Sequence, residues 1–300
     1  RDRLRSRGLG DVYKRQYMDW PRIEAVVYGE EASPKDVMAP RLTTDGVLIQ
    51  GFFPEADKTE VLVGSRKYEM EQEDEAGYFA AMIPGRKIPD YKYRVTKGEE
   101  TKEFADPYAF SGQITEAEEK AFCAGVYYHA YEKLGAHPMK INGVKGTSFA
   151  VWAPNAMRVS VVGDFNAWDG RCHAMHRMPM SGIFELFIPD VKAGDIYKYE
   201  LKLKGNRIEL KSDPYAACTE VPPANASVVT DTSTFQWEDE IWMKERKKFS
   251  DRKQPISIYE TSLTEWKDAT ELADFVKKLN YTHVEPVSYT HLRAHETGAY

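Results

Sequence analysis

Residues 183–203 read IFELFIPDVKAGDIYKYELKL, two strand-like runs joined by a segment that contains proline, glycine and aspartate. In the second run apolar and charged side chains alternate, in the order Tyr197, Lys198, Tyr199, Glu200, Leu201, Lys202 and Leu203. This alternation predicts an antiparallel strand with one buried face. The runs 149–152 and 159–162 are also short and rich in β-branched or aromatic residues. Several short strands at this spacing predict a β-sandwich.

A series of four motifs occurs twice along the chain. The first copy is FFPEADKTEVLV at 52–63, GYFAAMIPG at 77–85, YKYRV at 91–95 and DPYAF at 106–110. The second copy is VWAPNAMRVSVVG at 151–163, GIFELFIPD at 182–190, YKYEL at 197–201 and DPYAA at 213–217. Because four motifs keep their order, we predict two related β-sandwich modules of the immunoglobulin-like type.

We place the first module at 17–125 and the second at 126–235. The aspartate-proline pairs at 106 and 213 are turn signals that would close each module. Between the modules, Thr115 and Glu118 form a capping-box pattern, which predicts a helix that begins at Glu116.

The region after the second module has a different pattern. We predict a linker at 236–253 and a first strand at 256–260, followed by a helix at 268–279 and a second strand at 282–285. The helix is amphipathic, with apolar residues at helical spacing: Leu272, Phe275, Val276 and Leu279. Strand, helix and strand of this length match one repeat of a (β/α)₈ barrel. The expected fold class is therefore mostly β, with two sandwiches and, at 254–286, the truncated start of a barrel.

The two ends of the chain carry one short DNA element in opposite orientations. GATGTGTATAAGAGACAG encodes DVYKRQ at 11–16, and its complementary strand encodes VSYTH at 287–291. We therefore expect 1–16 and 287–300 to be translated sequencing adaptor, and we exclude both from fold reasoning. These segments hold seven basic and three acidic side chains, so the formal net charge of −6 becomes −10 without them. The basic start, which would suggest nucleic acid, is thereby removed.

Composition limits the possible partners and environment. The chain is 42% hydrophobic and 12% aromatic, and it contains no apolar run long enough to span a membrane. Its cysteines are odd in number and scattered, at Cys123, Cys172 and Cys218. This pattern fits a reducing cytoplasm rather than a disulfide framework. We expect a cytoplasmic monomer that has no membrane or nucleic-acid partner and no cofactor.

The stretch 131–171, YEKLGAHPMKINGVKGTSFAVWAPNAMRVSVVGDFNAWDGR, resembles the carbohydrate-binding module of glycogen (1,4-α-glucan) branching enzymes, which are α-amylase-type glycoside hydrolases. The resemblance continues through WEDEIWMKER at 237–246 and QPISIYE at 254–260. It implies two β-sandwiches followed by a (β/α)₈ barrel. The implied activity is transfer of α-1,4-glucan segments to 6-hydroxyls in glycogen synthesis, with glycogen or α-1,4-glucan as partner.

A retaining transfer of this kind requires one carboxylate as nucleophile and a second as acid/base, about 5–5.5 Å apart. In the family that the chain resembles, these residues follow later barrel strands than the two expected here. We therefore assign no catalytic residue and expect this fragment to be inactive. Glu260 and Glu285 lie near strand ends, but a carboxylate without a placed partner is weak support for catalysis, and we interpret both as structural.

The segment GDFNAWDG places Trp168 in a polar turn, where a large ring can serve as a platform for a sugar. The resemblance to glycogen-binding modules adds Lys198 and Asn225 as hydrogen-bonding partners of the sugar hydroxyls. Packing of Trp168 on a neighbouring domain is the alternative, and Trp152 is expected in the core. Cys172, His173 and His176 resemble a metal cluster only in spacing, so we predict a polar loop and no metal site.

Two other functions fit parts of the pattern. A debranching hydrolase would share the module and the barrel, although the doubled module and LGAHP at 134–138 favour branching. A non-catalytic glycogen-binding scaffold or regulatory module would have no use for the beginning of a barrel at 255–286.

Overall fold

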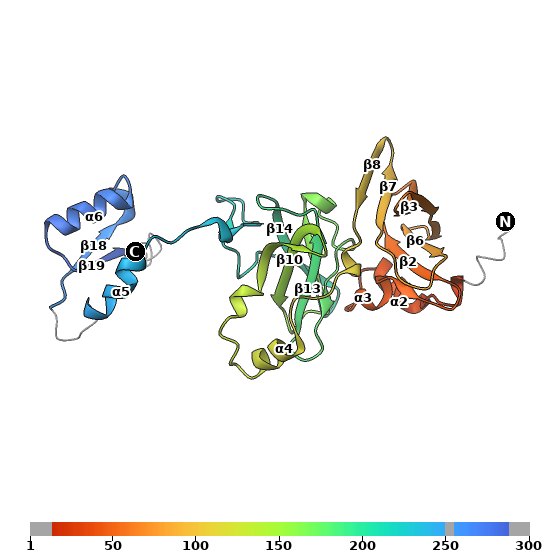
Figure 1. Ribbon diagram of the computed structural model, residues 1–300, viewed down its shortest axis with the longest axis horizontal. Coiled ribbons are helices and arrows are strands. Elements are labelled where there is room, and N and C mark those ends of the chain that lie inside the picture. The colour runs from red at the N-terminus through yellow and green to blue at the C-terminus, as the bar shows by residue number, and fades with distance from the viewer. Residues whose placement is uncertain (1–13, 250–254, 288–300) are drawn as a thin grey trace. The chain divides into compact units, whose positions relative to one another are not determined.

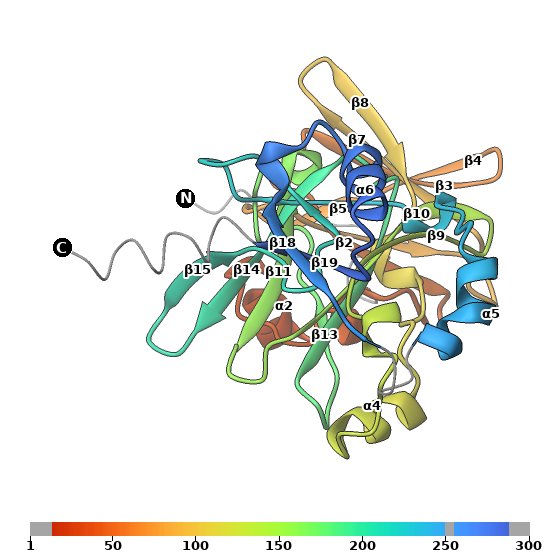
Figure 2. The same ribbon diagram turned by 90° about the vertical axis from the view of Figure 1, so that its left-hand side faces the viewer.

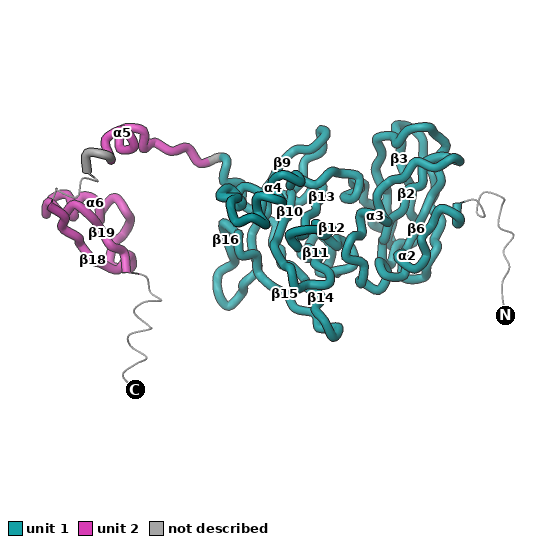
Figure 3. Tube along the Cα trace, turned by 90° about the horizontal axis from the view of Figure 1, so that it is seen from below, with its two compact units in different colours: residues 1–234 teal, residues 235–300 magenta. Residues whose placement is uncertain are grey.

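The computed structural model describes residues 14–249 and 255–287 (Figure 1). The chain forms two compact units, residues 1–234 and residues 235–300 (Figure 3). Along the described ranges, no helix combines the length and the apolar character needed to cross a bilayer.

The first unit begins with two short helices and a sandwich of two four-stranded antiparallel sheets. The helices are α2 (Trp20–Val27) and α3 (Lys35–Met38). One sheet has the order β1-β2-β6-β5 and the other β4-β3-β7-β8. Their strands are β1 (Arg41–Leu42), β2 (Val47–Phe52), β3 (Lys58–Val63), β4 (Arg66–Glu69), β5 (Glu71–Asp74), β6 (Tyr78–Ile83), β7 (Lys92–Lys97) and β8 (Glu100–Phe104).

The second sandwich follows the helix α4 (Glu116–Cys123). Its sheets have the orders β12-β13-β10-β9 and β11-β14-β17-β16, and β15 pairs with β14 outside that path. The strands are β9 (Gly135–Ile141), β10 (Val144–Trp152), β11 (Arg158–Gly163), β12 (His176–Arg177), β13 (Ile183–Pro189), β14 (Ile196–Leu203), β15 (Arg207–Lys211), β16 (Cys218–Thr219) and β17 (Ser227–Val228). The four strand runs expected in this module are confirmed.

The sequence repeat corresponds to a repeat of structure. β3 pairs with β7 as β11 pairs with β14, and β2 pairs with β6 as β10 pairs with β13. Each copy also contains a buried aspartate that binds two tyrosines. Tyr91 Oη and Tyr93 Oη donate to Asp106 Oδ2 at 2.5 and 3.1 Å. Tyr197 Oη and Tyr199 Oη donate to Asp213 Oδ2 at 2.6 and 3.2 Å.

The two sandwiches share one hydrophobic core. Leu48, Phe52 and Tyr108 of the first pack in the same buried cluster as Val161 and Tyr199 of the second. Hydrogen bonds also join them: for example, Tyr108 Oη donates to Ala174 O at 3.1 Å, and Arg177 N donates to Ala32 O at 3.2 Å. The pair of modules therefore forms a single compact unit rather than two separate bodies.

The helices follow local sequence rules where such signals exist. The capping box of α4 is present, because Glu118 N donates to Thr115 Oγ1 at 3.3 Å and Thr115 N donates to Glu118 Oε2 at 2.8 Å. Helix α2 buries Ile23, Val26 and Val27 in the shared core. Neither α2 nor α3 was predicted from the sequence.

Two positions differ from expectation. Trp152 is 54% exposed rather than in the core, because it ends β10 at the sandwich edge, where its Nε1 donates to Ser181 O at 2.9 Å. Lys202 was expected on the solvent face of its strand but is only 7% exposed. Glu30, from the segment after α2, accepts from Lys202 Nζ at 3.0 Å, so the N-terminal segment covers this end of β14.

The second unit contains α5 (Glu240–Phe249), which lies within the predicted linker, and then β18 (Ile258–Ser262), α6 (Ala269–Lys278) and β19 (His283–Val287). β18 and β19 pair in parallel. The predicted strand–helix–strand arrangement is therefore present, with Leu272 and Val276 as the buried residues of α6. Tyr259 of β18 packs on Trp266 and Phe275, whereas Ile258 and Val284 are exposed.

Candidate functional site

The loop that carries Trp168 follows β11 through a 3₁₀ turn at Asp164–Asn166. The side chain of Asn166 holds this turn, since its Oδ1 accepts from Gly163 N at 3.0 Å and its Nδ2 donates to Val161 O at 2.9 Å. Asparagine suits the position because one amide can both donate to and accept from the backbone.

Trp168 adopts an unusual backbone conformation. Its φ is +60° and that of Ala167 is +53°, in the left-handed region that bulky L-residues seldom occupy. Two hydrogen bonds hold the residue there: Trp168 N donates to Gly163 O at 3.0 Å, and the indole Nε1 donates to Asp164 Oδ1 at 2.8 Å. Such strain persists only where the surroundings enforce it, and it is concentrated at functional positions. The indole is half-buried.

The other two predicted site residues are hydrogen-bonded to each other, Lys198 from β14 and Asn225 from the segment before β17. Lys198 Nζ donates to Asn225 Oδ1 at 2.5 Å. Lys198 is the register partner of Val162, and its neighbour Tyr197 is opposite Gly163, the residue that accepts from Trp168 N. The backbone of Trp168 is thus tied to the end of β11, where the neighbouring strand carries Lys198.

A buried ion pair, which we did not anticipate from the sequence, supports the base of this loop. Arg158 is 2% exposed, and its Nη2 donates to Glu200 Oε1 at 2.6 Å. Its Nη1 donates to Gly170 O at 2.6 Å, two residues beyond Trp168. A side chain at Gly170 would meet the Glu200 carboxylate, because an added Cβ would lie 2.0 Å from Oε1. Strand alternation predicted Glu200 as a solvated residue, so the pattern gave no sign of this pair.

The hairpin between β14 and β15 projects from the second sandwich (Figure 2). Its turn contains Gly205 and Asn206, both with positive φ, and no tryptophan.

The side chains of Cys172, His173 and His176 have different surroundings. His173 Nδ1 is 2.8 Å from Asn166 Nδ2, and burial lowers the pKa of His173 to about 4. Burial also raises the pKa of the Cys172 thiol to about 12. His176 lies on β12, and its Nδ1 is buried without a hydrogen-bond partner. Within the part of the chain that the structure describes, no group of three or more potential ligands could hold a metal.

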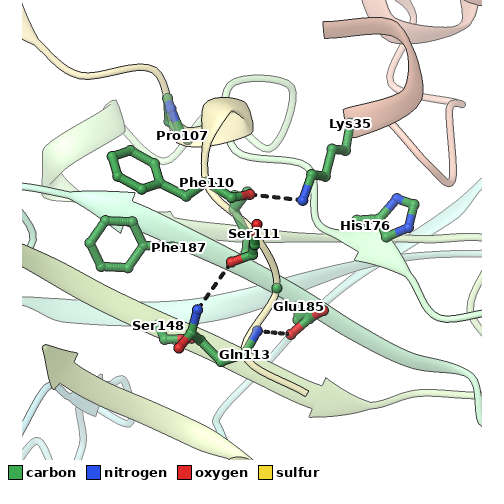
Figure 4. Close-up of a pocket in the computed structure, with 11 residues that line it drawn as sticks. Lys35, Pro107, Phe110, Ser111, Gln113, Ser148, His176, Glu185 and Phe187 are labelled. Atoms are coloured by element: carbon green, nitrogen blue, oxygen red, sulfur yellow. Dashed lines mark hydrogen bonds between the residues drawn. The ribbon is translucent and has the colours of Figure 1, made fainter. Parts of the chain in front are cut away.

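A small cavity lies where the segment between the modules crosses β13 (Figure 4). Glu185 enters it and accepts from Gln113 N at 2.8 Å and Ile114 N at 3.2 Å. Burial raises the pKa of Glu185, although these two hydrogen bonds act in the opposite direction. The cavity volume is about 20 Å³, which is room for one water molecule and not for a sugar. Glu185 is therefore an anchor for the connecting segment.

Glu260 and Glu285 are register partners in the parallel pair β18–β19, and both are exposed. The adjacent residues of β18, Tyr259 and Thr261, face the α6 side, since Tyr259 packs on Phe275 and Thr261 is buried. The two glutamates consequently point away from α6.

Comparison with known families identifies both modules. The family model "alpha-1,4-glucan branching enzyme GlgB, N-terminal domain" matches residues 19–108. The model "Carbohydrate-binding module 48 (Isoamylase N-terminal domain)" matches residues 133–216.

Individual relatives agree. The 1,4-alpha-glucan branching enzyme of Cereibacter sphaeroides is 43% identical over 252 residues, which are 80% of this chain and 35% of that protein. That of Saccharophagus degradans is 37% identical over 89% of this chain and 39% of its own length. A solved pullulanase from Bacillus subtilis superposes with a TM-score of 0.37 at 18% identity, over 84% of this chain and 38% of the pullulanase chain. The chain thus spans less than two fifths of the length of these relatives. It belongs to the 1,4-alpha-glucan branching enzyme family and matches the N-terminal part of its members.

Proposed function

We propose that this chain is the glucan-binding and positioning part of a 1,4-α-glucan branching enzyme. The parent enzyme would transfer α-1,4-glucan segments to 6-hydroxyls with retention of configuration. Such chemistry requires a nucleophilic carboxylate and an acid/base carboxylate held close together. The chain would supply carbohydrate contacts and the first strand–helix–strand repeat of the barrel, and by itself would have no transferase activity.

The observation that carries the binding proposal is the geometry around Trp168. An indole fixed in a left-handed backbone conformation is tied to Gly163 at the end of β11. The register partner of Gly163 is Tyr197, and the next residue of β14 is Lys198, which is hydrogen-bonded to Asn225. The C–H face of a glucose ring stacks on an indole, and an ammonium and an amide can hydrogen-bond its hydroxyls. We assign Trp168 as the platform, with Lys198 and Asn225 as hydroxyl partners.

Retardation of the protein in native gels that contain glycogen tests this assignment. Trp168→Ala should migrate faster than the wild type in the presence of glycogen and equally without it. Trp152→Ala is the matched control, because Trp152 is a solvent-accessible indole of the same sandwich but pairs in the sheet that does not contain Lys198. Equal retardation of wild type and Trp168→Ala would rule out the platform.

The absence of transferase activity is tested separately. Purified protein incubated with amylose should leave the absorbance of the amylose–iodine complex unchanged, whereas a branching activity would lower this absorbance.

We further infer a layout of two modules, 17–125 and 126–235, a linker at 236–253 and a barrel portion at 254–286. Free thiols at Cys123, Cys172 and Cys218 support a cytoplasmic location, and we infer a monomer without nucleic-acid or membrane partners.

A further inference from the structure

A cavity of about 420 Å³ lies between the two sandwich modules. It is within the size range of small-molecule sites, which are concave, mostly apolar and supplied with a few polar groups. The volume is sufficient for one or two glucose rings. None of Trp168, Lys198 or Asn225 lines this cavity, so it is distinct from the site proposed above.

Aromatic rings from both modules form its walls. Phe53 and Phe165 line it from the first and second sandwich respectively. Each ring lies over a glycine two residues earlier in its own chain segment: a Cβ added to Gly51 would be 2.3 Å from the Phe53 ring, and one added to Gly163 would be 2.5 Å from the Phe165 ring. The two glycines thus permit two half-buried phenylalanines to border the same space.

The polar groups of the lining indicate a neutral ligand. Lys102 is accompanied by Glu103 and Asp190, both acidic. A phosphate or other polyanion would meet more negative than positive charge here. Asn166 and His173 also line the cavity and are hydrogen-bonded to each other. Amide and imidazole groups beside aromatic rings suit the hydroxyls and C–H faces of a sugar.

We propose that this intermodule cavity binds one or two α-linked glucose units, as in maltose, between Phe53 and Phe165. The choice of sugar rests on the proposed glucan-binding function, whereas the existence of a small-molecule site rests on the cavity itself. Occupancy would link the two modules, because each contributes one ring and part of the polar lining.

Cys172 provides a reporter, since its side chain lines the cavity and the chain's other cysteines are exposed. In the full chain carrying Cys123→Ser and Cys218→Ser, the alkylation rate of Cys172 by iodoacetamide would be measured with and without maltose at pH 9, because burial raises the pKa of this thiol and the thiolate is the reactive form. At a maltose concentration ten times Kd, we expect alkylation to slow about tenfold. Cellobiose, the β-linked isomer, is the matched sugar control and should not protect.

Two variants test the cavity by different means. Phe165→Ala removes one wall, and Val95→Trp fills the space, because Val95 also lines it. Both should abolish protection by maltose and the accompanying rise in Tm, which we expect to be about 2–5 °C in the wild type. Phe122→Ala, an aromatic truncation beside Trp152 and outside the cavity, should retain both effects.

The Trp168→Ala variant separates this proposal from the surface platform. If the cavity binds maltose, Trp168→Ala should still show maltose protection of Cys172, even where glycogen retardation is lost. Absence of both protection and a Tm rise in the folded wild type would overturn the cavity proposal and leave the Trp168 platform unaffected. Equal protection by maltose and cellobiose would overturn the assignment to α-linked glucose.

Discussion

Replacement of Asp106 by asparagine should change how the stability of the first unit depends on pH. Asp106 is 2% exposed, and burial raises the pKa of its carboxyl to about 6, despite hydrogen bonds from Tyr91, Tyr93 and the amide of Tyr108. A folded-state pKa above the unfolded value means that the native protein binds the proton more tightly. The associated stability is complete below the unfolded pKa and is lost as pH rises through the folded pKa.

The magnitude follows from the shift. The pKa rises from 3.8 to about 6, and each unit corresponds to about 1.4 kcal/mol, so the full shift is worth about 3 kcal/mol. Because the unfolded carboxyl is already partly ionised at pH 4, about 2 kcal/mol of unfolding free energy is lost between pH 4 and pH 7. His173 acts in the opposite direction, because burial lowers its pKa to about 4 and its contribution grows as pH rises. The wild-type profile alone would therefore hide the effect of Asp106.

The informative quantity is the difference between the wild type and Asp106→Asn. Urea unfolding at a series of pH values from 4 to 7.5 gives this difference in unfolding free energy. The contributions of the other titrating groups are the same in both proteins and cancel. We expect the wild type to lose about 2 kcal/mol relative to the variant across this range. Any hydrogen bond weakened by the amide adds an offset that does not vary with pH.

Two control variants sharpen the result. Asp213→Asn alters the equivalent network of the second module, whose carboxyl also has a raised pKa because of burial, and should change the profile with the same sign. Asp90→Asn alters an exposed carboxyl and should leave the difference flat. A difference between wild type and Asp106→Asn that stays constant within about 0.5 kcal/mol would refute the reasoning, because a group with an ordinary pKa gives no such slope.

Three further predictions concern the loop, the helix and the second unit. Arg158→Met should lower the unfolding free energy by about 2–3 kcal/mol in urea titrations, because it leaves the half-buried Glu200 without its partner; a change below about 1 kcal/mol would contradict this. Thr115→Ala should cost about 1 kcal/mol by removing the cap of α4, and Thr115→Ser should restore most of it. In hydrogen exchange, amides of β18 and β19 should exchange faster than those of β10 and β13, since they form a two-stranded sheet with exposed apolar residues; equal protection would contradict this.

Local patterns in the sequence determined much of the architecture. Alternation and β-branched runs located β10, β11, β13 and β14, because side-chain direction has a period of two in a strand whatever surrounds it. The repeat of DPYA motifs anticipated two equivalent modules, and its structural basis is the pair of buried aspartates at 106 and 213. The capping box of α4 and the order strand–helix–strand at 258–287 were likewise predictable from the sequence, since both depend on residues close in the chain.

Only the tertiary structure decided which polar side chains are buried and which aromatic ones are exposed. Lys202 and Glu200 follow the alternation of a solvated face, yet residues distant in sequence, Glu30 and Arg158, cover and bind them. Trp152 was expected in the core, but it ends its strand at the sandwich edge. The cavity between the modules involves side chains separated by more than 100 residues, from Phe53 to Phe165. Periodicity reports the direction of a side chain from its own backbone, whereas the occupant of the space beyond it is set by packing between distant segments.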